Sequence, residues 1–223
     1  MVFEHLISGN PWKAVNRNTP QKILPEDREV IERFNARHKG RDTEVRFELL
    51  PEPFVGNPKA PIWLLNLNPG FSEGEIALES SVENDKERNL RLEHEEFWYL
   101  HPSMAKSPGG EYWQNKLRRL MSDVSAQKLS RSLFVVEYFP YHSTRYAEIK
   151  ILPSQKFTKS LVKWGVEQKK EIVVLRSLRR WTSFIPELAA HNVHVLNSPQ
   201  NVSFTPNNVP RYDEIVKVIQ GIA

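Results

Sequence analysis

The sequence predicts an α/β fold, a three-layer α/β/α sandwich with a central four-stranded parallel sheet. Four short apolar runs are continuous rather than alternating, which is typical of strands buried on both faces; they cover residues 62–65, 133–136, 172–175 and 193–196. Segments with helical spacing separate these runs, and such alternation indicates βαβ units with right-handed crossovers. With 39% hydrophobic residues, the 223-residue chain is large enough to bury one such core.

Apolar residues at helical spacing mark the segments between the strands. They recur three and four positions apart over residues 112–121, 157–164, 181–188 and 215–222. Prolines interrupt the chain before residue 61, and one helix fits there, beginning at Pro25 and ending near Gly40. We interpret residues 1–60 as an N-terminal extension packed on a core domain of residues 61–223.

The composition excludes several classes of protein. The chain has no cysteine, and therefore no disulfide, thiolate-held iron–sulfur cluster or cysteine zinc site. Its seven histidines lack the spacing of a zinc protease, and no Walker-type loop or G-x-G-x-x-G motif is present. We therefore expect neither a metal nor a cofactor.

Nothing in the sequence directs the chain to a membrane or to export. Met1–His5 lacks the basic and apolar regions of a signal peptide, and no apolar run approaches the roughly 20 residues that span a bilayer. We expect a cytoplasmic monomer. The net charge of +4 is compatible with nucleic-acid binding and equally with an ordinary charged surface.

The residues that follow each run form the candidate site, because ligands of open parallel sheets bind beyond the carboxyl ends of the strands. The first run leads into Asn68-Pro69-Gly70-Phe71. Asn68 could orient a water or read a base edge, while Pro69 and Gly70 form a tight turn. Phe71 could stack on a planar ring. The alternative is a plain turn with a capping asparagine.

The second run leads into a carboxylate, aromatic rings and a histidine. Glu137 could accept a hydrogen bond from a ring N–H or act as a base. Tyr138 adds an aromatic ring, and His142 could move a proton. The alternative is a buried glutamate that pairs with an arginine, beside aromatic residues that cap the core.

Basic and polar residues follow the last two runs. Arg176, Arg179 and Arg180 lie at a helix start, which suits phosphate contacts, although a solvated basic turn is equally compatible. The loop after the fourth run is polar and could close over a ligand; it contains Asn197, Ser198, Gln200 and Asn201.

These four segments, in this order, resemble the uracil-DNA glycosylase superfamily. Leu65–Gly70 is similar to the water-positioning motif of its mismatch-specific and single-strand-selective branches, and Pro53–Pro58 resembles the approach to that motif. Glu137–Pro140 is similar in register to the base-reading segment, and Asn197–Gln200 occupies the place of the H-P-S-P motif. The resemblance covers about residues 53–205 in organisation, and the N-P-G element alone is close in sequence.

The resemblance implies a hydrolase that acts on DNA or on a free nucleoside, with DNA or a nucleoside or nucleobase as its partner. Base flipping would precede attack of water at the anomeric carbon of the sugar. The implied catalytic residues are Asn68, which would orient the water, Glu137 and His142. The implied base-binding residues are Pro69, Gly70, Phe71, Tyr138 and Asn197. The implied nucleic-acid contacts are Arg176, Arg179, Arg180, Ser198, Gln200 and Asn201.

Two positions depart from the family pattern. Asn197 stands where the family has a histidine that stabilises the leaving base, and Glu137 replaces an asparagine. An ionised glutamate offers only acceptors, so it would favour a base edge that carries donors and repel the carbonyl of uracil. We therefore expect an altered base specificity.

Two other functions remain open. One is a non-catalytic module of the same fold that binds nucleic acid or a nucleobase, and the other is a small-molecule enzyme unrelated to nucleic acid. The acidic stretch of residues 73–96 would repel phosphates, so we expect a solvated helix folded away from the site. Phe97–Pro102 could form an aromatic wall of the pocket or pack into the core.

Overall fold

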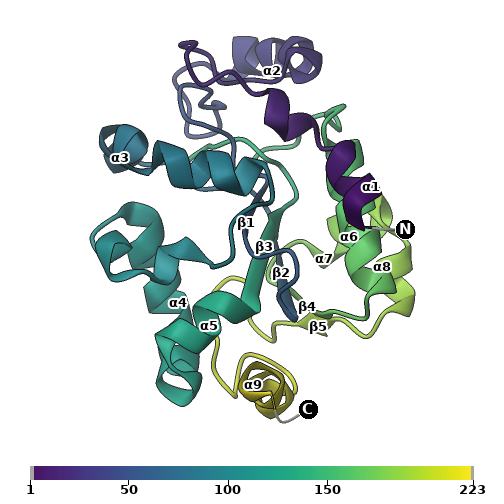
Figure 1. Cartoon of the computed structure of the whole chain (residues 1–223). Helices are drawn as coiled ribbons and strands as arrows, with labels where there is room; N and C mark the ends of the chain where they lie inside the picture. The colour runs from purple at the N-terminus through teal and green to yellow at the C-terminus, as the bar shows by residue number, and fades with distance from the viewer. Residues whose placement is uncertain (1–2, 222–223) are drawn as a thin grey trace.

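Five strands form one mixed sheet, in the order β1-β3-β2-β4-β5, in the computed structural model, which describes residues 3–221 (Figure 1). Four of them run parallel: β2 (Ile62–Asn66), β3 (Leu133–Glu137), β4 (Glu171–Val174) and β5 (His194–Val195). They coincide with the predicted apolar runs, so the prediction of an α/β fold is confirmed. The prediction of a purely parallel sheet of four strands is wrong, because a fifth, antiparallel strand joins it.

This fifth strand, β1 (Phe54–Gly56), lies at the edge of the sheet beside β3. It comes from the segment predicted as an N-terminal extension, so that segment contributes directly to the sheet. Three strand residues between Pro53 and Pro58 are too few to produce a periodic pattern in the sequence. Pairing with β3 defines the strand, and Phe54 lies opposite Val136.

Helices pack on both faces of the sheet and make three layers (Figure 1). Side chains alternate along β2, so that Trp63 and Leu65 join one core and Ile62 and Leu64 the other. The first core includes residues of α1 (Phe3–Ser8), α2 (Pro25–His38), α6 (Gln155–Glu167), α7 (Leu178–Phe184) and α8 (Glu187–Ala190). The second includes residues of α4 (Pro108–Val124), α5 (Ala126–Ser132) and α9 (Tyr212–Gln220).

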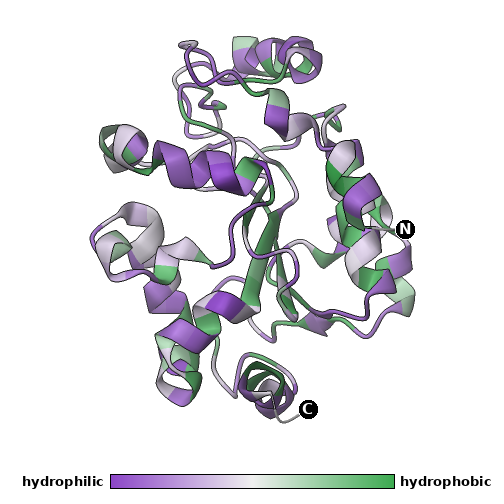
Figure 2. Ribbon diagram, viewed as in Figure 1, coloured by the Kyte–Doolittle hydropathy of each residue, from purple (hydrophilic) through white to green (hydrophobic). Residues whose placement is uncertain are grey.

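One long helix, α3 (Glu73–Leu90), belongs to both cores, because Val82 packs in the second and Leu90 in the first. Short 3-10 helices complete the chain; they are η1 (Pro11–Ala14), η2 (Trp98–Leu100) and η3 (Pro102–Met104). Figure 2 shows that the strands are hydrophobic, whereas the helices also carry hydrophilic residues, as expected for helices that bury one face.

The predicted helical segments correspond to α4, α6 and α9, with one exception. The segment 181–188 is divided between α7 and α8, since α7 ends at Phe184, ahead of Pro186, whose ring disfavours helical continuation. Ile222, at the end of the last predicted segment, lies outside the described residues. Within residues 3–221, no helix is both long enough and apolar enough to cross a bilayer.

Gly56 allows β1 to lie close to β3. Its φ is +103°, and a Cβ added there would lie 2.5 Å from the carbonyl oxygen of Leu133. We expect Gly56→Ala to lower the free energy of unfolding by more than about 2 kcal/mol, because backbone strain and steric overlap add. Urea denaturation would measure the loss. Gly40→Ala is the matched control, because Gly40 has a φ of +71° but open space around it; equal losses would contradict this explanation.

Candidate functional site

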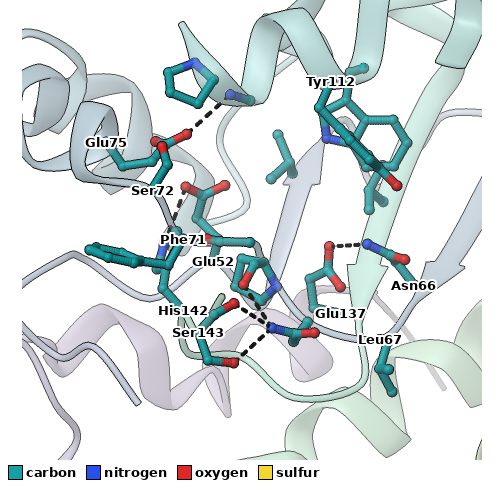
Figure 3. A pocket seen from close by; sticks show the side chains of 18 of the residues that line it. Glu52, Asn66, Leu67, Phe71, Ser72, Glu75, Tyr112, Glu137, His142 and Ser143 are labelled. Atoms are coloured by element: carbon teal, nitrogen blue, oxygen red, sulfur yellow. Dashed lines mark hydrogen bonds and ion pairs between the residues drawn. The ribbon is translucent and has the colours of Figure 1, made fainter. Parts of the chain in front are cut away.

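A cavity of about 300 Å³ lies at the carboxyl ends of β2 and β3 (Figure 3). It is bounded by these strand ends, the turn of residues 66–72 after β2, the segment before β1, the first turn of α3 and the start of α4. The predicted site residues that line it are Asn68, Pro69, Gly70, Phe71, Glu137, His142 and Arg176. The structure thus brings together side chains from three strand ends that are far apart in the sequence.

The register of the parallel strands positions the polar groups of this cavity. Asn66 lies opposite Glu137 in the pairing of β2 with β3, and Asn66 Nδ2 donates a hydrogen bond of 3.0 Å to Glu137 Oε1. Arg176 follows the end of β4, on the other side of β2. An amide, a carboxyl and a guanidinium group therefore come from three adjacent strand ends. Asn66 was not among the predicted site residues. It ends β2 beside Glu137 at the end of β3, and this position at a strand end was the signal that could have identified it.

Glu137 is a buried carboxylic acid rather than an exposed carboxylate. Its side chain is 4% exposed, and Oε2 has no hydrogen-bond partner among the described residues. Burial raises the pKa of Glu137 to about 8, with the charge of Glu52 adding to the shift and Asn66 and Arg176 opposing it. The group is therefore mainly protonated at neutral pH. We expected an ionised Glu137, which would offer only acceptors. The protonated acid can also donate a hydrogen bond.

Asn68 is half-buried and is held in one orientation by the segment after β3. Its Nδ2 donates to the carbonyl oxygens of Pro69 at 2.9 Å and Ser143 at 3.2 Å, and to Ser143 Oγ at 3.0 Å. Carbonyl oxygens can only accept, which fixes which end of the amide is the nitrogen. The Oδ1 atom is then the end of Asn68 left to accept a hydrogen bond from a ligand or water.

Phe71 lines the cavity, but one face of its ring is already covered. The guanidinium carbon of Arg46 lies 3.9 Å from the ring centroid, a cation–π contact. Only the remaining face and the ring edge are available to a planar ligand. Arg46 was not among the predicted site residues, and its distance in the sequence from Phe71 gives no signal for this contact.

His142 is 2% exposed and holds the cavity wall together. Its Nδ1 lies 2.7 Å from the carbonyl oxygen of Gly70, and its Nε2 lies 3.0 Å from that of Leu50. Burial lowers the pKa of His142, while the nearby Glu52 carboxylate opposes this shift. Because both ring nitrogens face backbone carbonyls, this geometry favours a positioning role over the predicted proton transfer.

A buried ionic network lies against the same wall. Lys86 Nζ is 2.7 Å from Glu79 Oε2 and 3.1 Å from Glu52 Oε1, and Tyr99 donates to both Glu52 oxygens at 3.0 and 2.8 Å. Burial disfavours the charged form of Glu52, but Lys86 and His142 outweigh it and hold its pKa below the ordinary value. Glu79 also accepts a hydrogen bond of 2.5 Å from the Leu50 amide. The network therefore ties α3 to the segment before β1.

Part of the acidic stretch lies at the site, contrary to the prediction that it folds away. Glu75, in the first turn of α3, is buried, lines the cavity and accepts a hydrogen bond of 3.1 Å from the Gly109 amide (Figure 3). Burial raises its pKa, and the charge of Glu52 adds to the shift. Tyr99 also lines the cavity, whereas Phe97 packs in the core, so both readings of the aromatic segment hold in part. Tyr112 of α4 extends from the opposite side toward Glu137 (Figure 3).

Several predicted residues lie outside the cavity. Tyr138 packs edge-on against Trp181 and Phe184, at 5.4 Å from each ring, because consecutive strand residues point to opposite faces. Arg179 is exposed, and Arg180 pairs with Glu148. The polar loop after β5 is also outside; it contains Asn197, Ser198, Gln200 and Asn201.

The loop after β5 is closed on itself. Asn197 Nδ2 donates to the Asn207 carbonyl at 2.8 Å, and Asn208 Oδ1 accepts from the Ser198 amide at 2.7 Å. Asn208 Nδ2 also donates to the Asn201 carbonyl at 2.9 Å. The Asn197 side-chain nitrogen is therefore already hydrogen-bonded, and no residue of this loop lines the cavity.

Gly70-Phe71-Ser72-Glu73-Gly74 matches the G-x-S-x-G pattern of serine hydrolases and lies between β2 and α3. Ser72 has an extended backbone, with a φ of −143°, and its buried hydroxyl has no partner among residues 3–221. The nitrogens of His142 face backbone carbonyls instead. This geometry lacks the serine–histidine contact that activates such a nucleophile.

The comparisons with known proteins leave the site to be interpreted from its own residues. No protein-family model, curated protein sequence or solved structure matches this chain. Among the described residues, no group of three or more histidine, aspartate or glutamate side chains has the arrangement of a metal site. Function is therefore inferred from the hydrogen-bonding groups and charges of the cavity.

Lys86 compensates two buried carboxylates. We expect Lys86→Met to lower the free energy of unfolding by about 3–5 kcal/mol, because it leaves buried negative charge without its partner. Urea denaturation at pH 7 would measure this change. Lys163→Met is the matched control, since the Lys163–Glu187 pair is about 40% exposed and we expect a loss below about 1 kcal/mol. A loss for Lys86→Met as small as that of the control would show that the network contributes little.

Glu137 should make stability fall as pH rises. Between its ordinary pKa of 4.5 and its folded value of about 8, the folded state binds more protons than the unfolded chain, so stability declines across this window. We expect Glu137→Gln to be more stable than wild type by a few kcal/mol at pH 9 and nearly equal to it near pH 4.5. Urea denaturation at several pH values would measure this, with the exposed Glu95→Gln as a control expected to change little. A pH-independent difference would contradict the raised pKa.

Proposed function

We propose that this chain is an N-glycosylase of the uracil-DNA glycosylase type, which acts on a base of DNA or on a nucleoside. One observation carries this proposal: Asn68 and Glu137 line the same cavity at the carboxyl ends of adjacent parallel strands. Its volume of about 300 Å³ lies at the small end of ligand pockets, which suits a single base rather than a whole nucleotide.

In this proposal, Asn68 Oδ1 accepts a hydrogen bond from the attacking water. The Nδ2 atom is held by Ser143, so the acceptor is oriented before the substrate enters. The water oxygen forms a bond to the anomeric carbon, the glycosidic C–N bond breaks, and its electron pair goes to the base nitrogen. The proton that the water loses ends on the departing base, so the products are a sugar hydroxyl and the free base. The departing base needs a positive or hydrogen-bonding group beside it, and Arg176 lines the same cavity.

Of the proposed DNA contacts, Arg176 lines the cavity, whereas Arg179, Arg180 and the loop of residues 197–201 do not. Glu52, whose pKa is held below its ordinary value, lines the cavity as a carboxylate, and this negative charge disfavours phosphate groups. A neutral base that has left the stack would enter, while the phosphate backbone would stay outside. Arg179 and the loop of residues 197–201 remain the proposed backbone contacts, as residues that follow parallel strands at the same edge of the sheet.

Removal of the Asn68 amide should slow base release. The substrates would be single- and double-stranded oligonucleotides with deaminated or alkylated bases, together with free nucleosides, and the readout would be abasic sites or released base. We expect Asn68→Ala to lower the rate by about 10²–10³-fold, as loss of an oriented catalytic hydrogen bond does. Asn18→Ala is the matched control and should retain activity, because Asn18 is exposed and does not line the cavity. Absence of base release from every substrate would refute the enzymatic proposal.

A second function, a nucleobase-binding module without catalysis, is favoured by the state of His142. Both of its ring nitrogens lie at backbone carbonyls, and Asn197 donates to Asn207, so neither supplies a free donor for a leaving base. This alternative predicts DNA affinity that falls with salt, because phosphate contacts release counterions, and no product at any enzyme concentration. Affinity that stays constant between low and high salt would argue against it.

A further inference from the structure

A groove of about 560 Å³ lies between α4 and the segment that follows β5. Three cations, an amide and three hydroxyl groups line it; they belong to Lys116, Arg118, Arg119, Asn115, Ser122, Ser203 and Thr205. None of the described residues that line this groove is acidic. A concave surface of this composition attracts anions and offers them hydrogen-bond donors.

The spacing of the residues along α4 places four of these side chains on one side of the helix. Asn115, Arg118, Arg119 and Ser122 follow one another at offsets of three, four and seven positions, and all four are exposed. The opposite side of α4 is apolar and packs in the second core. The core therefore fixes the helix, while the polar stripe remains in solvent.

The other wall of the groove is held against α4 by the main chain. The Phe204 amide donates a hydrogen bond of 2.9 Å to the carbonyl oxygen of Lys116, and the Phe204 side chain is fully buried. Ser203 and Thr205, which flank Phe204, both line the groove. The two walls are thus positioned before any partner binds.

The positive charges of the groove are neutralised only in part. Arg119 Nε lies 3.0 Å from Asp123 Oδ2, so this cation already has an acidic partner. Arg118 instead donates to the neutral side chain of Asn115, and no described acidic residue forms an ion pair with Arg118 or Lys116. Two of the three cations are therefore available to an anionic partner.

The groove adjoins the cavity along α4. Tyr112 lines the cavity, and Lys116, one helical turn later, lines the groove with its Nζ 5.7 Å from the centroid of the Tyr112 ring. The Glu52 carboxylate disfavours phosphate groups in the cavity, whereas the cations favour them in the groove. A ligand with a neutral part and a phosphate part would therefore find a place for each at neighbouring sites.

We propose that the groove on α4 binds the phosphate backbone of a nucleic-acid strand. The stripe from Asn115 to Ser122 is about 10 Å long at 1.5 Å per residue, enough for two or three phosphates spaced by roughly 3.4 Å along the axis. A phosphopeptide would bring a single phosphate, and a membrane surface would call for apolar side chains, which the lining lacks. The choice of a nucleic acid rests on the proposed function, whereas the groove itself lies outside the proposed catalytic cavity.

The salt dependence of oligonucleotide binding tests this inference. The probe is a labelled single-stranded oligonucleotide with ordinary bases, and fluorescence anisotropy would measure its affinity for the full chain at several salt concentrations. We expect the double variant Lys116→Gln/Arg118→Gln to reduce the slope of log affinity against log salt by about 1.4, because each lost phosphate contact removes about 0.7 on a single strand. Affinity at about 0.1 M salt should fall at least about tenfold.

Arg37→Gln is the matched control, because Arg37 is exposed on α2 and does not line the groove. This control should keep the wild-type slope, and so should Arg118→Lys, which retains the positive charge. Circular dichroism would check the fold of the double variant; if it does not fold, the single exposed variant Arg118→Gln decides, with an expected change in slope of about 0.7. Equal slopes for the double variant and the control, wild-type binding that does not change with salt, or no binding of the oligonucleotide would overturn the proposal.

Two further probes separate other partners from a nucleic acid. Binding of a phosphoserine peptide, or of vesicles that contain phosphatidylserine, without binding of the oligonucleotide would overturn the choice of partner. Anisotropy reports binding alone, so the result does not depend on catalysis. The expected change in slope without base release from any substrate would support the groove and refute the enzymatic proposal. Base release together with an unchanged slope would support the enzyme and overturn this inference.

Discussion

The hydrogen bond between Asn66 and Glu137 links the last residues of β2 and β3, and both residues line the cavity. The parallel register of β2 and β3 ends both strands at the same level, so the amide and the carboxyl group meet inside the protein. The bond occupies one oxygen of Glu137, and the other is buried without a partner among the described residues. Burial favours the acid form and raises the pKa of Glu137 to about 8.

A second constraint is the cost of burying charge in the adjoining wall. Lys86, which is 1% exposed, lies between Glu52 and Glu79, and Tyr99 donates to Glu52. Paired in this way, the charges hold α3 against the segment before β1, whereas removal of one partner would leave the others uncompensated. His142 extends this wall through its contacts to two backbone carbonyls. This wall therefore presents the Glu52 carboxylate to the cavity, and its negative charge disfavours phosphate groups.

Under the proposed function, this arrangement would separate the binding of a base from the binding of phosphate groups. The cavity has the oriented acceptor of Asn68, a hydrogen-bonding edge at Glu137 and the guanidinium of Arg176, which together suit a neutral heterocycle. Phosphate groups would have to be bound outside it. Arg46 covers one face of Phe71, so only the other face and the ring edge are open to a planar ligand.

The sequence by itself determined the α/β class, the four parallel strands and the position of the cavity at their carboxyl ends. A continuous apolar run indicates a strand that is buried on both faces. Asn68 and Glu137 could be predicted as cavity residues because they lie where two of these runs end. The strand β1 and the division of the last helices were not recognisable, since three residues carry no periodicity and local propensity does not report cross-strand pairing.

Tertiary structure alone decided which charges are buried and with which partners. The glutamates of α3 have the spacing of a solvated helix, yet Glu75 and Glu79 are buried because Gly109, Leu50 and Lys86 supply donors from distant segments. The protonation of Glu137 depends in the same way on its enclosure and on the nearby Glu52. Electrostatic interactions act across space rather than along the chain, and therefore residue types at the strand ends could be predicted from sequence, whereas their ionisation could not.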